Sequence, residues 1–262
     1  MKTVIVTGSS RGLGLCMARE FLMAGCNVAV SGSSEASLSH ATKELGKFGD
    51  RVLFVPCDVR KMADVEGLWN AAAAQWGRVD IWINNAGRNV PYELIHNTQQ
   101  EYIHAVVDTN LKGMIYGSQV AAAHMLAQGG GQIWNMEGLG SNGMVEARTV
   151  LYGTTKAALT YFTKGLTKEL AGTGVLVGHL SPGMMLTEFI TKGPDGEPSP
   201  AIEQQKFRKV FNILADQPET VAAFFIPRIL ANQKNGVHIE WLTGWKAAVR
   251  FVAAPFMKRK LM

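Results

Sequence analysis

Short apolar runs alternate with longer amphipathic segments over most of the chain. Runs rich in β-branched residues and bounded by turn residues predict buried strands, and apolar positions spaced three and four apart predict helices. The predicted strands span residues 3–6, 27–31, 52–56, 80–83, 132–136 and 175–180. The helices that follow them end near residues 24, 47, 76, 126 and 171. Because strand and helix alternate with no long linker and no internal repeat, the pattern predicts an α/β fold in one domain, 1–262, with a doubly wound parallel sheet between two helical layers.

Composition and charge exclude several classes of protein. The chain has 262 residues, 47% hydrophobic and 18% charged, which is typical of a soluble globular domain. Its formal charge is +5 with an isoelectric point near 9.1, but the basic residues form no stripe. We therefore expect an anionic ligand or surface rather than nucleic acid.

Cysteine and histidine usage predicts no metal site. Cys16, Cys26 and Cys57 lie in or beside apolar runs, so we expect buried free thiols and a reducing compartment. The six histidines show no ligand spacing. No uncharged apolar run approaches the roughly 20 residues of a spanning helix, and the N-terminus leads straight into a strand, so a cytoplasmic location is expected.

A glycine-rich turn joins the first predicted strand to the first helix. The turn Thr7–Gly14 places glycines where backbone must approach a phosphate closely, and the helix start adds amide donors and partial positive charge. It therefore predicts a dinucleotide site. The residues expected to contact the cofactor here are Gly8, Ser10, Arg11, Gly12, Leu13 and Gly14.

The end of the second predicted strand bears on the choice of cofactor. It carries Gly32, Ser33 and Ser34, with no carboxylate to bind ribose hydroxyls or repel a 2′-phosphate. Arg11 supplies a matching cation and Ser33 a hydroxyl donor, so the sequence predicts NADP(H) rather than NAD(H). The alternative is that Arg11 is only a solvated loop charge.

Further candidates follow the third and fourth predicted strands. Asp58, with Val59 beside it, either holds the edge of an adenine ring or caps the next helix. The small residues Asn85, Ala86 and Gly87 let the chain turn under a cofactor. Within the predicted helix 99–126, Asn110 is a poor helix-interior residue, which suggests a role in holding a water that leads to Lys156.

Tyr152 and Lys156 lie four residues apart at the start of the predicted helix 151–171. At that spacing the two side chains share a helix face. A phenol has a pKa of about 10, and a neighbouring ammonium favours the phenolate and lowers that value. The pair thus predicts a tuned proton donor and acceptor. The alternative, chance spacing on a surface helix, is disfavoured by the other motifs arranged in order around it.

The residues Thr7–Gly14, Asn84–Gly87, the Tyr152/Lys156 pair and Ser181–Gly183 together resemble the short-chain dehydrogenase/reductase family over roughly residues 1–190. The resemblance implies a Rossmann-like fold, a nicotinamide cofactor that delivers its pro-S hydride, and a homo-dimer or homo-tetramer. It implies that Tyr152 is the general acid/base and that Lys156 orients the nicotinamide ribose and lowers the tyrosine pKa. It also implies roles for Asn110 as the active-site asparagine and for Pro182, Gly183 and Thr187 beside the cofactor.

One position departs from the family pattern. The family usually has a serine about 13 residues before the tyrosine to bind the substrate oxygen, and Ser141, 11 residues before Tyr152, is the nearest candidate here. The flexible turn Gly138–Gly140 would bring Ser141 into place. If Ser141 is only a loop hydroxyl, a backbone amide or a water must polarise the substrate carbonyl.

A narrower resemblance points to the chlorophyll b reductase subgroup. It rests on residues 135–143, 210–215 and 241–244. It implies reduction of a formyl group to a hydroxymethyl group on a large tetrapyrrole. The sequence thus predicts an NADPH-dependent carbonyl reductase for a small-molecule substrate, and the alternative is a non-catalytic NADP-binding sensor or scaffold.

Two C-terminal segments complete the expectations. Residues 184–216 are predicted to form a substrate lid, whose larger apolar side chains either suit a bulky substrate or pack on the core; they are Met184, Met185, Phe189, Phe207 and Phe211. The tail 241–262 carries an apolar stripe at helical spacing, Trp241, Trp245, Val249, Val252 and Phe256, flanked by Lys246 and Arg250 and followed by the basic run 258–260. The stripe predicts a helix that lies on a membrane surface, docks on a subunit or covers the active site.

Overall fold

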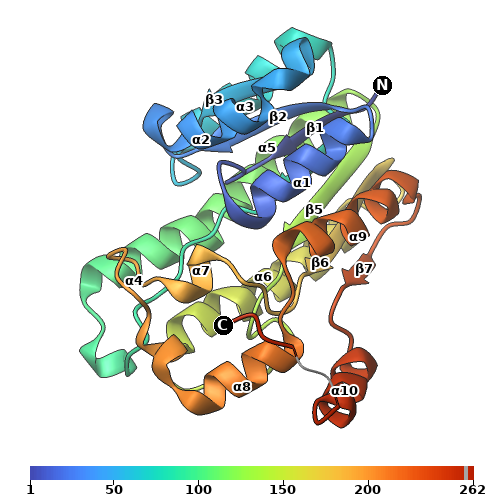
Figure 1. Cartoon of the computed structure of the whole chain (residues 1–262). Coiled ribbons are helices and arrows are strands. Elements are labelled where there is room, and N and C mark those ends of the chain that lie inside the picture. Colours follow the sequence, from blue (N-terminus) through green and yellow to red (C-terminus); the bar gives the residue numbers. More distant parts are fainter. Residues whose placement is uncertain (257–258) are drawn as a thin grey trace.

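The computed structural model describes residues 1–256 and 259–262 and contains one seven-stranded parallel sheet in the order β3-β2-β1-β4-β5-β6-β7. Figure 1 shows the sheet running through the middle of the molecule with helices packed on it. The strands are β1 (Thr3–Val6), β2 (Asn27–Gly32), β3 (Val52–Pro56), β4 (Ile81–Asn84), β5 (Gly131–Met136), β6 (Val175–Ser181) and β7 (Val237–Glu240).

Helices cover both faces of the sheet, which is why the central strands are continuous apolar runs. In β1, Val4 and Val6 contact one core cluster and Ile5 contacts the other, as the alternation of a strand requires. The first cluster includes side chains of α1 (Gly12–Met23), α2 (Glu35–Leu45) and α9 (Pro218–Ala231). The second includes side chains of α3 (Met62–Trp76), α5 (Gly113–Ala127) and α6 (Val150–Glu169). The predicted three-layer α/β/α fold is confirmed.

The strand order reverses at β1, which pairs with β2 on one side and with β4 on the other. In such sheets the loops after neighbouring strands leave in opposite directions there and open a crevice at the carboxyl ends. The glycine-rich turn follows β1 at this point. Topology alone therefore places the predicted motifs at one edge of the sheet.

The sequence did not predict two elements, the strand β7 and the helix α9. The strand β7 is a four-residue edge strand in which apolar and polar residues alternate, and only Ile239 in it is buried. The helix α9 has a proline at its start and another, Pro227, inside it, which weakens the helical pattern. Both are held by tertiary contacts, since α9 packs on α1 and β7 pairs with β6.

The predicted helix 99–126 is divided into three parts. It consists of α4 (Gln100–Val106), a π-helical segment (Val107–Lys112) and α5. Asn110 lies in the π segment and is only 1% exposed. Such π segments in otherwise regular helices are frequent at functional sites because they redirect a side chain and free backbone groups.

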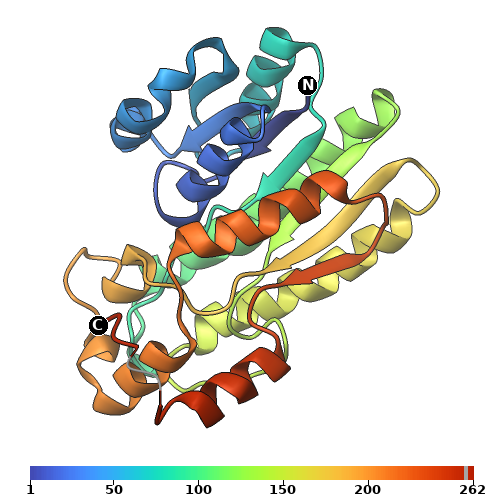
Figure 2. The same cartoon turned by 45° about the vertical axis from the view of Figure 1, so that its right-hand side comes forward.

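Short elements gather below the carboxyl edge of the sheet, where the lid was predicted (Figures 1 and 2). They are α7 (Glu188–Thr191), a 3-10 turn (Pro200–Glu203), α8 (Gln205–Leu214) and α10 (Gly244–Ala253). Further 3-10 turns span Gly46–Arg51 and Ile95–Asn97. Among the described helices, none is both long and apolar enough to cross a bilayer.

The tail differs from the single stripe that was expected. Trp241 precedes α10, and its indole N–H donates to the Asp216 carboxylate at 2.7 Å. Arg250 binds the same carboxylate at 2.7 Å, and the Lys246 ammonium lies over the Trp241 ring. The remaining apolar residues of the stripe stay exposed: Trp245, Val249, Val252 and Phe256. Of the basic run 258–260, Lys258 lies outside the described residues, and Arg259 also binds Asp216.

The three cysteines are free and buried, as predicted. Burial raises the pKa of the Cys16 and Cys57 thiols to about 12 and also raises that of Cys26. At neutral pH they are therefore neutral thiols that pack as small apolar side chains.

Candidate active site

A cavity of about 2290 Å³ runs along the carboxyl edge of the sheet, from the turn after β1 to the segments after β6 and β7. All predicted site residues line it except Asn110. It exceeds the range of about 300–1,000 Å³ common for single ligand pockets. The space accommodates a dinucleotide together with a large second ligand.

The glycine-rich turn is built to receive an anion. Gly8 and Gly12 have φ angles of +61° and +57°, which glycine adopts without strain. The residue before α1, Arg11, makes no side-chain capping bond, so the first amides of the helix face the cavity without a side-chain cap. The Asn85 side chain braces the turn by donating to the Thr7 carbonyl oxygen at 2.9 Å. These features fit the pyrophosphate of a dinucleotide.

The residues predicted to choose the cofactor stand at the solvent-exposed rim. Ser33 is exposed at the end of β2, and no carboxylate occupies residues 32–34. The Arg11 guanidinium contacts the Glu188 carboxylate at 3.2 Å, and both side chains are more than half exposed. An exposed ion pair of this kind is weak, so Arg11 remains available to an anionic ligand.

Asp58 does not cap the helix that follows it, so that alternative was wrong. The helix α3 begins at Met62, and its N-terminal flanking residue Lys61 makes no side-chain cap. The Asp58 carboxylate instead accepts three side-chain contacts from Arg60, at 2.6 to 3.1 Å. These bonds lower the pKa of Asp58 and keep it charged at the cavity wall.

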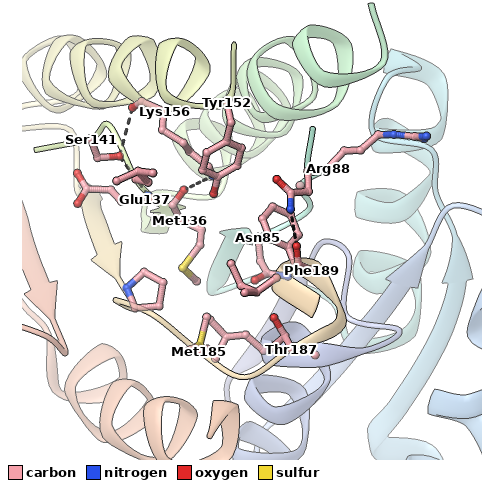
Figure 3. A pocket seen from close by; sticks show the side chains of 18 of the residues that line it. Asn85, Arg88, Met136, Glu137, Ser141, Tyr152, Lys156, Met185, Thr187 and Phe189 are labelled. Carbon is pink, nitrogen blue, oxygen red and sulfur yellow. Dashed lines mark hydrogen bonds between the residues drawn. The ribbon is translucent and has the colours of Figure 1, made fainter. Parts of the chain in front are cut away.

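Tyr152 and Lys156 project together from the first turns of α6 into the cavity, as their spacing predicted (Figure 3). The Lys156 ammonium lies 5.7 Å from the centre of the Tyr152 ring and donates to the Met136 carbonyl oxygen at 2.9 Å. Lys156 is only 5% exposed. The pair therefore sits at the end of β5, with Tyr152 half-buried and the Lys156 ammonium shielded from bulk water.

The pKa of Tyr152 moves in the direction opposite to the prediction. Burial of its hydroxyl raises the pKa above the ordinary value of about 10. The ammonium does not offset this, because Lys156, with a pKa of about 8, has lost its charge at the high pH where the phenol titrates. Burial also lowers the pKa of Lys156 to about 8, while the Glu137 charge acts in the raising direction. At neutral pH the pair is a phenol beside an ammonium, which is a proton-donating combination.

Asn110 is close to the pair but behind the cavity wall. Its side chain accepts from the Arg88 N–H at 2.7 Å, donates to the Arg88 carbonyl at 3.0 Å and reaches the Thr155 hydroxyl at 3.4 Å. It therefore joins the loop after β4 to the helix that carries Tyr152. The predicted water held by its backbone remains a prediction.

Ser141 lies next to Lys156, and its hydroxyl is engaged with backbone. It accepts from the Gly138 N–H at 3.2 Å and donates to the Lys156 carbonyl oxygen at 3.3 Å. Gly138 is the residue that abuts the tyrosine hydroxyl, since a Cβ placed on it would lie 2.4 Å from that oxygen. The Gly138–Gly140 turn thus brings Ser141 against α6, with no contact to the Tyr152 hydroxyl.

The opposite wall is formed by the chain after β6. Pro182, Gly183 and Thr187 line the cavity there, with Thr187 across from Tyr152 (Figure 3). Phe189, on α7, packs edge-on against the Tyr152 ring, with the two ring centres 5.7 Å apart. The lid segment therefore touches Tyr152 directly.

Sequence reasoning missed one group at the site. Glu137 follows β5 directly and is bonded by His179 of β6 and His238 of β7. An acidic residue immediately after a buried apolar strand was the available signal. The two histidines are 59 residues apart in the chain and meet only through the pairing of β6 with β7.

A family model described as short chain dehydrogenase matches residues 2–198. The chain is 37% identical over 260 residues to "Probable chlorophyll(ide) b reductase NYC1, chloroplastic" of Arabidopsis thaliana, covering 92% of this chain and 51% of that protein. It is 36% identical over 258 residues to "Chlorophyll(ide) b reductase NOL, chloroplastic" of Oryza sativa subsp. japonica, covering 94% of this chain and 73% of that protein. Both resemblances drawn from the sequence are confirmed.

A solved structure shares the fold closely. "The Closed form of serine dehydrogenase complexed with NADP+" superposes with a TM-score of 0.78 at 28% identity, covering 90% of this chain and 94% of that one. The chain spans about half the length of the Arabidopsis relative, so that protein has further sequence with no counterpart in this chain.

The raised pKa of Tyr152 is directly measurable. We expect the tyrosinate absorbance of the wild type minus that of Tyr152→Phe to stay flat up to pH 10, because the buried phenol keeps its proton above the ordinary value of about 10. The other four of the five tyrosines cancel in this difference. A midpoint below pH 9 for Tyr152 would show that the neighbouring ammonium outweighs burial.

Proposed function

Because the chain belongs to the short chain dehydrogenase family, we propose that it is an NADP(H)-dependent reductase of a carbonyl group, specifically a formyl group on a bulky apolar substrate. The observation that carries the proposal is the phenol and ammonium of α6 facing one cavity with an anion-binding turn. The names of the Arabidopsis and rice relatives support a chlorophyll(ide) b-like substrate.

The chain's own residues account for binding of the cofactor. The amides at the start of α1 and the glycine turn would hold the pyrophosphate, and Asp58 and Val59 would flank the adenine. Arg11 and Ser33 would bind a 2′-phosphate, while Asn85, Ala86 and Gly87 would pass beneath the cofactor. Pro182, Gly183 and Thr187 would lie beside the nicotinamide end, and Lys156 would orient the ribose. The bound cofactor supplies a hydride.

Tyr152 supplies the proton. The Tyr152 hydroxyl donates to the substrate oxygen as negative charge develops on it, which stabilises the transition state more than the ground state. The raised pKa of Tyr152 keeps the donor protonated at neutral pH. The charge of Lys156 then stabilises the phenolate that remains. A protonated phenol near pH 7 suits reduction of the carbonyl, because that direction of the reaction consumes a proton.

The substrate oxygen needs a second donor, and Ser141 is the proposed one. Its hydroxyl is bonded to the Lys156 carbonyl and would have to turn from that acceptor toward the cavity. The neighbouring Gly138 has no side chain to occupy the space before Tyr152. Asn110 would hold a water that leads to Lys156, and a proton would return to the pair through this water.

The lid supports a large apolar substrate. Met184, Met185, Phe189 and Phe207 line the cavity, whereas Phe211 is fully buried and belongs to the packing of α8. The lid consists of short helical elements joined by turns, and lids of this kind open and close around substrates.

The exposed stripe of α10 supports subunit contact. Trp245 is 79% and Val252 77% exposed, while Lys246 and Arg250 point toward the protein. A helix that binds an anionic membrane needs its cations beside the apolar face. A homo-dimer or homo-tetramer therefore fits this surface better than a membrane does.

A non-catalytic NADP-binding sensor or scaffold is the alternative. The engaged hydroxyl of Ser141 favours it, because that hydroxyl is bonded to backbone groups rather than directed at the space before Tyr152. The Tyr152–Lys156 geometry favours the enzyme.

Tyr152→Phe separates the two functions. Loss of the proton donor is expected to lower turnover of an aromatic or macrocyclic aldehyde by roughly 10²- to 10⁴-fold while leaving NADPH affinity within a factor of about two. Steady-state kinetics and fluorescence titration with NADPH measure the two quantities. Unchanged turnover in the variant would contradict the proposed role of Tyr152.

Arg11→Ala tests the choice of cofactor. Loss of a charged contact to the 2′-phosphate is expected to weaken NADPH binding by roughly ten- to a hundredfold and to leave NADH binding unchanged. Glu188→Gln is the matched control, because it removes the partner of Arg11 but keeps the guanidinium. Equal losses for NADPH and NADH in Arg11→Ala would show that Arg11 acts on the turn rather than on the phosphate.

A further inference from the structure

Glu137 is a buried carboxylate beside the proposed catalytic pair with no assigned role. Its side chain is 8% exposed and lies where β5, β6 and β7 end together. Figure 3 shows Glu137 and Ser141 on the same side of Lys156. A carboxylate so far from water is unfavourable unless other groups compensate it.

Two histidines from different strands compensate this charge. His179 reaches Glu137 through Nδ1 at 3.0 Å, and His238 through Nε2 at 2.9 Å. A charged carboxylate only accepts hydrogen bonds, so both nitrogens carry protons. These bonds hold the pKa of Glu137 at about 2 against the effect of burial, and they raise the pKa of His238. Glu137 is therefore charged at neutral pH.

The charge of the same carboxylate acts on the Lys156 ammonium at longer range than a direct ion pair. Lys156 donates to the carbonyl of Met136, the residue before Glu137. The Thr160 hydroxyl lies 3.3 Å from the Lys156 carbonyl oxygen and 3.4 Å from Glu137 Oε1. It therefore links the backbone of Lys156 to the Glu137 carboxylate. The direct acceptor of the ammonium is neutral, so balancing its charge falls to a carboxylate at longer range. Two charges interact more strongly where water is excluded from the space between them than they do in bulk water.

We propose that Glu137 is the counter-ion of Lys156 and that His179 and His238 fix it in place for that purpose. This inference rests on the proposed function only for its kinetic arm. Glu137 acts on the reaction through Lys156, so it is a positioning residue rather than a catalytic one. Its charge keeps Lys156 protonated through neutral pH, where burial would otherwise discharge the ammonium.

The charged groups around this cluster are few among the described residues. On α6 they are Lys156 itself and Lys164, which acts on His238 from a distance. On β7 they are His238 and Glu240, and on β6 His179. Because His238 is 47% exposed, it takes up protons from solvent, and its bond to the Glu137 carboxylate raises its pKa.

A purely structural role for Glu137 is the competing explanation. The carboxylate joins His179 and His238, which are paired neighbours on β6 and β7, and so ties the edge strand to the sheet. Removing such a link would lower stability. If the role of Glu137 is purely structural, removing its charge leaves the pKa of Lys156 unchanged. This difference separates the two explanations.

The test is the titration of Lys156 in the full-length protein without any substrate. Two-dimensional carbon–proton NMR of protein labelled at lysine follows the side-chain signal, which is assigned by its loss in Lys156→Arg. The wild type is expected to titrate near pH 8, and Glu137→Gln lower by about one pH unit or more. Glu240→Gln removes an equal charge nearby and is expected to leave the midpoint unchanged.

Folding of the variants is controlled in the same experiment. Glu137→Ser, which removes the charge and admits water to both histidines, is the second variant and is expected to lower the midpoint as Glu137→Gln does. A midpoint that matches the wild type in whichever of the two variants folds would overturn the proposal, whatever happens to stability.

The kinetic arm tests whether the coupling matters to turnover. The alkaline fall in NADPH-dependent aldehyde reduction is expected near pH 8 in the wild type and about one pH unit lower in Glu137→Gln. A shifted NMR midpoint with no reductase activity in any variant would uphold the counter-ion and reject the proposed function. An active reductase in which the Lys156 midpoint does not shift would uphold the proposed function and reject Glu137 as the counter-ion.

Discussion

A buried ammonium next to a phenol is the constraint on which the cavity depends. Lys156 is 5% exposed, and burial lowers its pKa to about 8 even though the charge of Glu137 acts in the raising direction. Holding it charged requires a carbonyl at the end of β5 and, in our account, a carboxylate one residue further on. The end of β5, the first turns of α6 and the ends of β6 and β7 must therefore meet at one place, and the sheet topology brings them there.

Much of this arrangement was predictable because its signals are local. The glycine turn lies between a strand and a helix, and Tyr152 and Lys156 share one helix face, so spacing alone brings them together. The three cysteines lie in apolar runs and are buried. The parallel sheet follows from the alternation of strands and helices, and its carboxyl edge then collects residues far apart in the chain.

The remainder depended on long-range contacts that no local pattern reports. The strand β7 is short and half polar and exists because it pairs with β6. The cluster of Glu137, His179 and His238 forms only through that pairing. The direction of the Tyr152 pKa was wrong because burial, which spacing does not reveal, outweighs a cation beside the ring. Ser141 lines the cavity beside α6 with its hydroxyl bonded to backbone groups, and its predicted contact with a substrate oxygen remains a prediction.

The C-terminal segments follow a similar logic. The Asp216 carboxylate accepts from Trp241, Arg250 and Arg259, and its own backbone bonds Met184 at the start of the lid. One carboxylate thus ties the tail to the lid. The cations that the sequence pattern placed beside an apolar stripe are directed inward, Arg250 to Asp216 and Lys246 to Trp241, while Trp245 and Val252 remain exposed.

The central claim is that Tyr152 and Lys156 serve a hydride transfer in this cavity. The most direct measurement is the transfer of deuterium from stereospecifically labelled NADPH to a formyl-bearing aromatic or macrocyclic substrate, followed by mass spectrometry of the alcohol. The account predicts one deuterium on the new hydroxymethyl carbon with the pro-S label and none with the pro-R label. Alcohol formed without any label from NADPH, or no alcohol at all from a protein that binds NADPH, would contradict it.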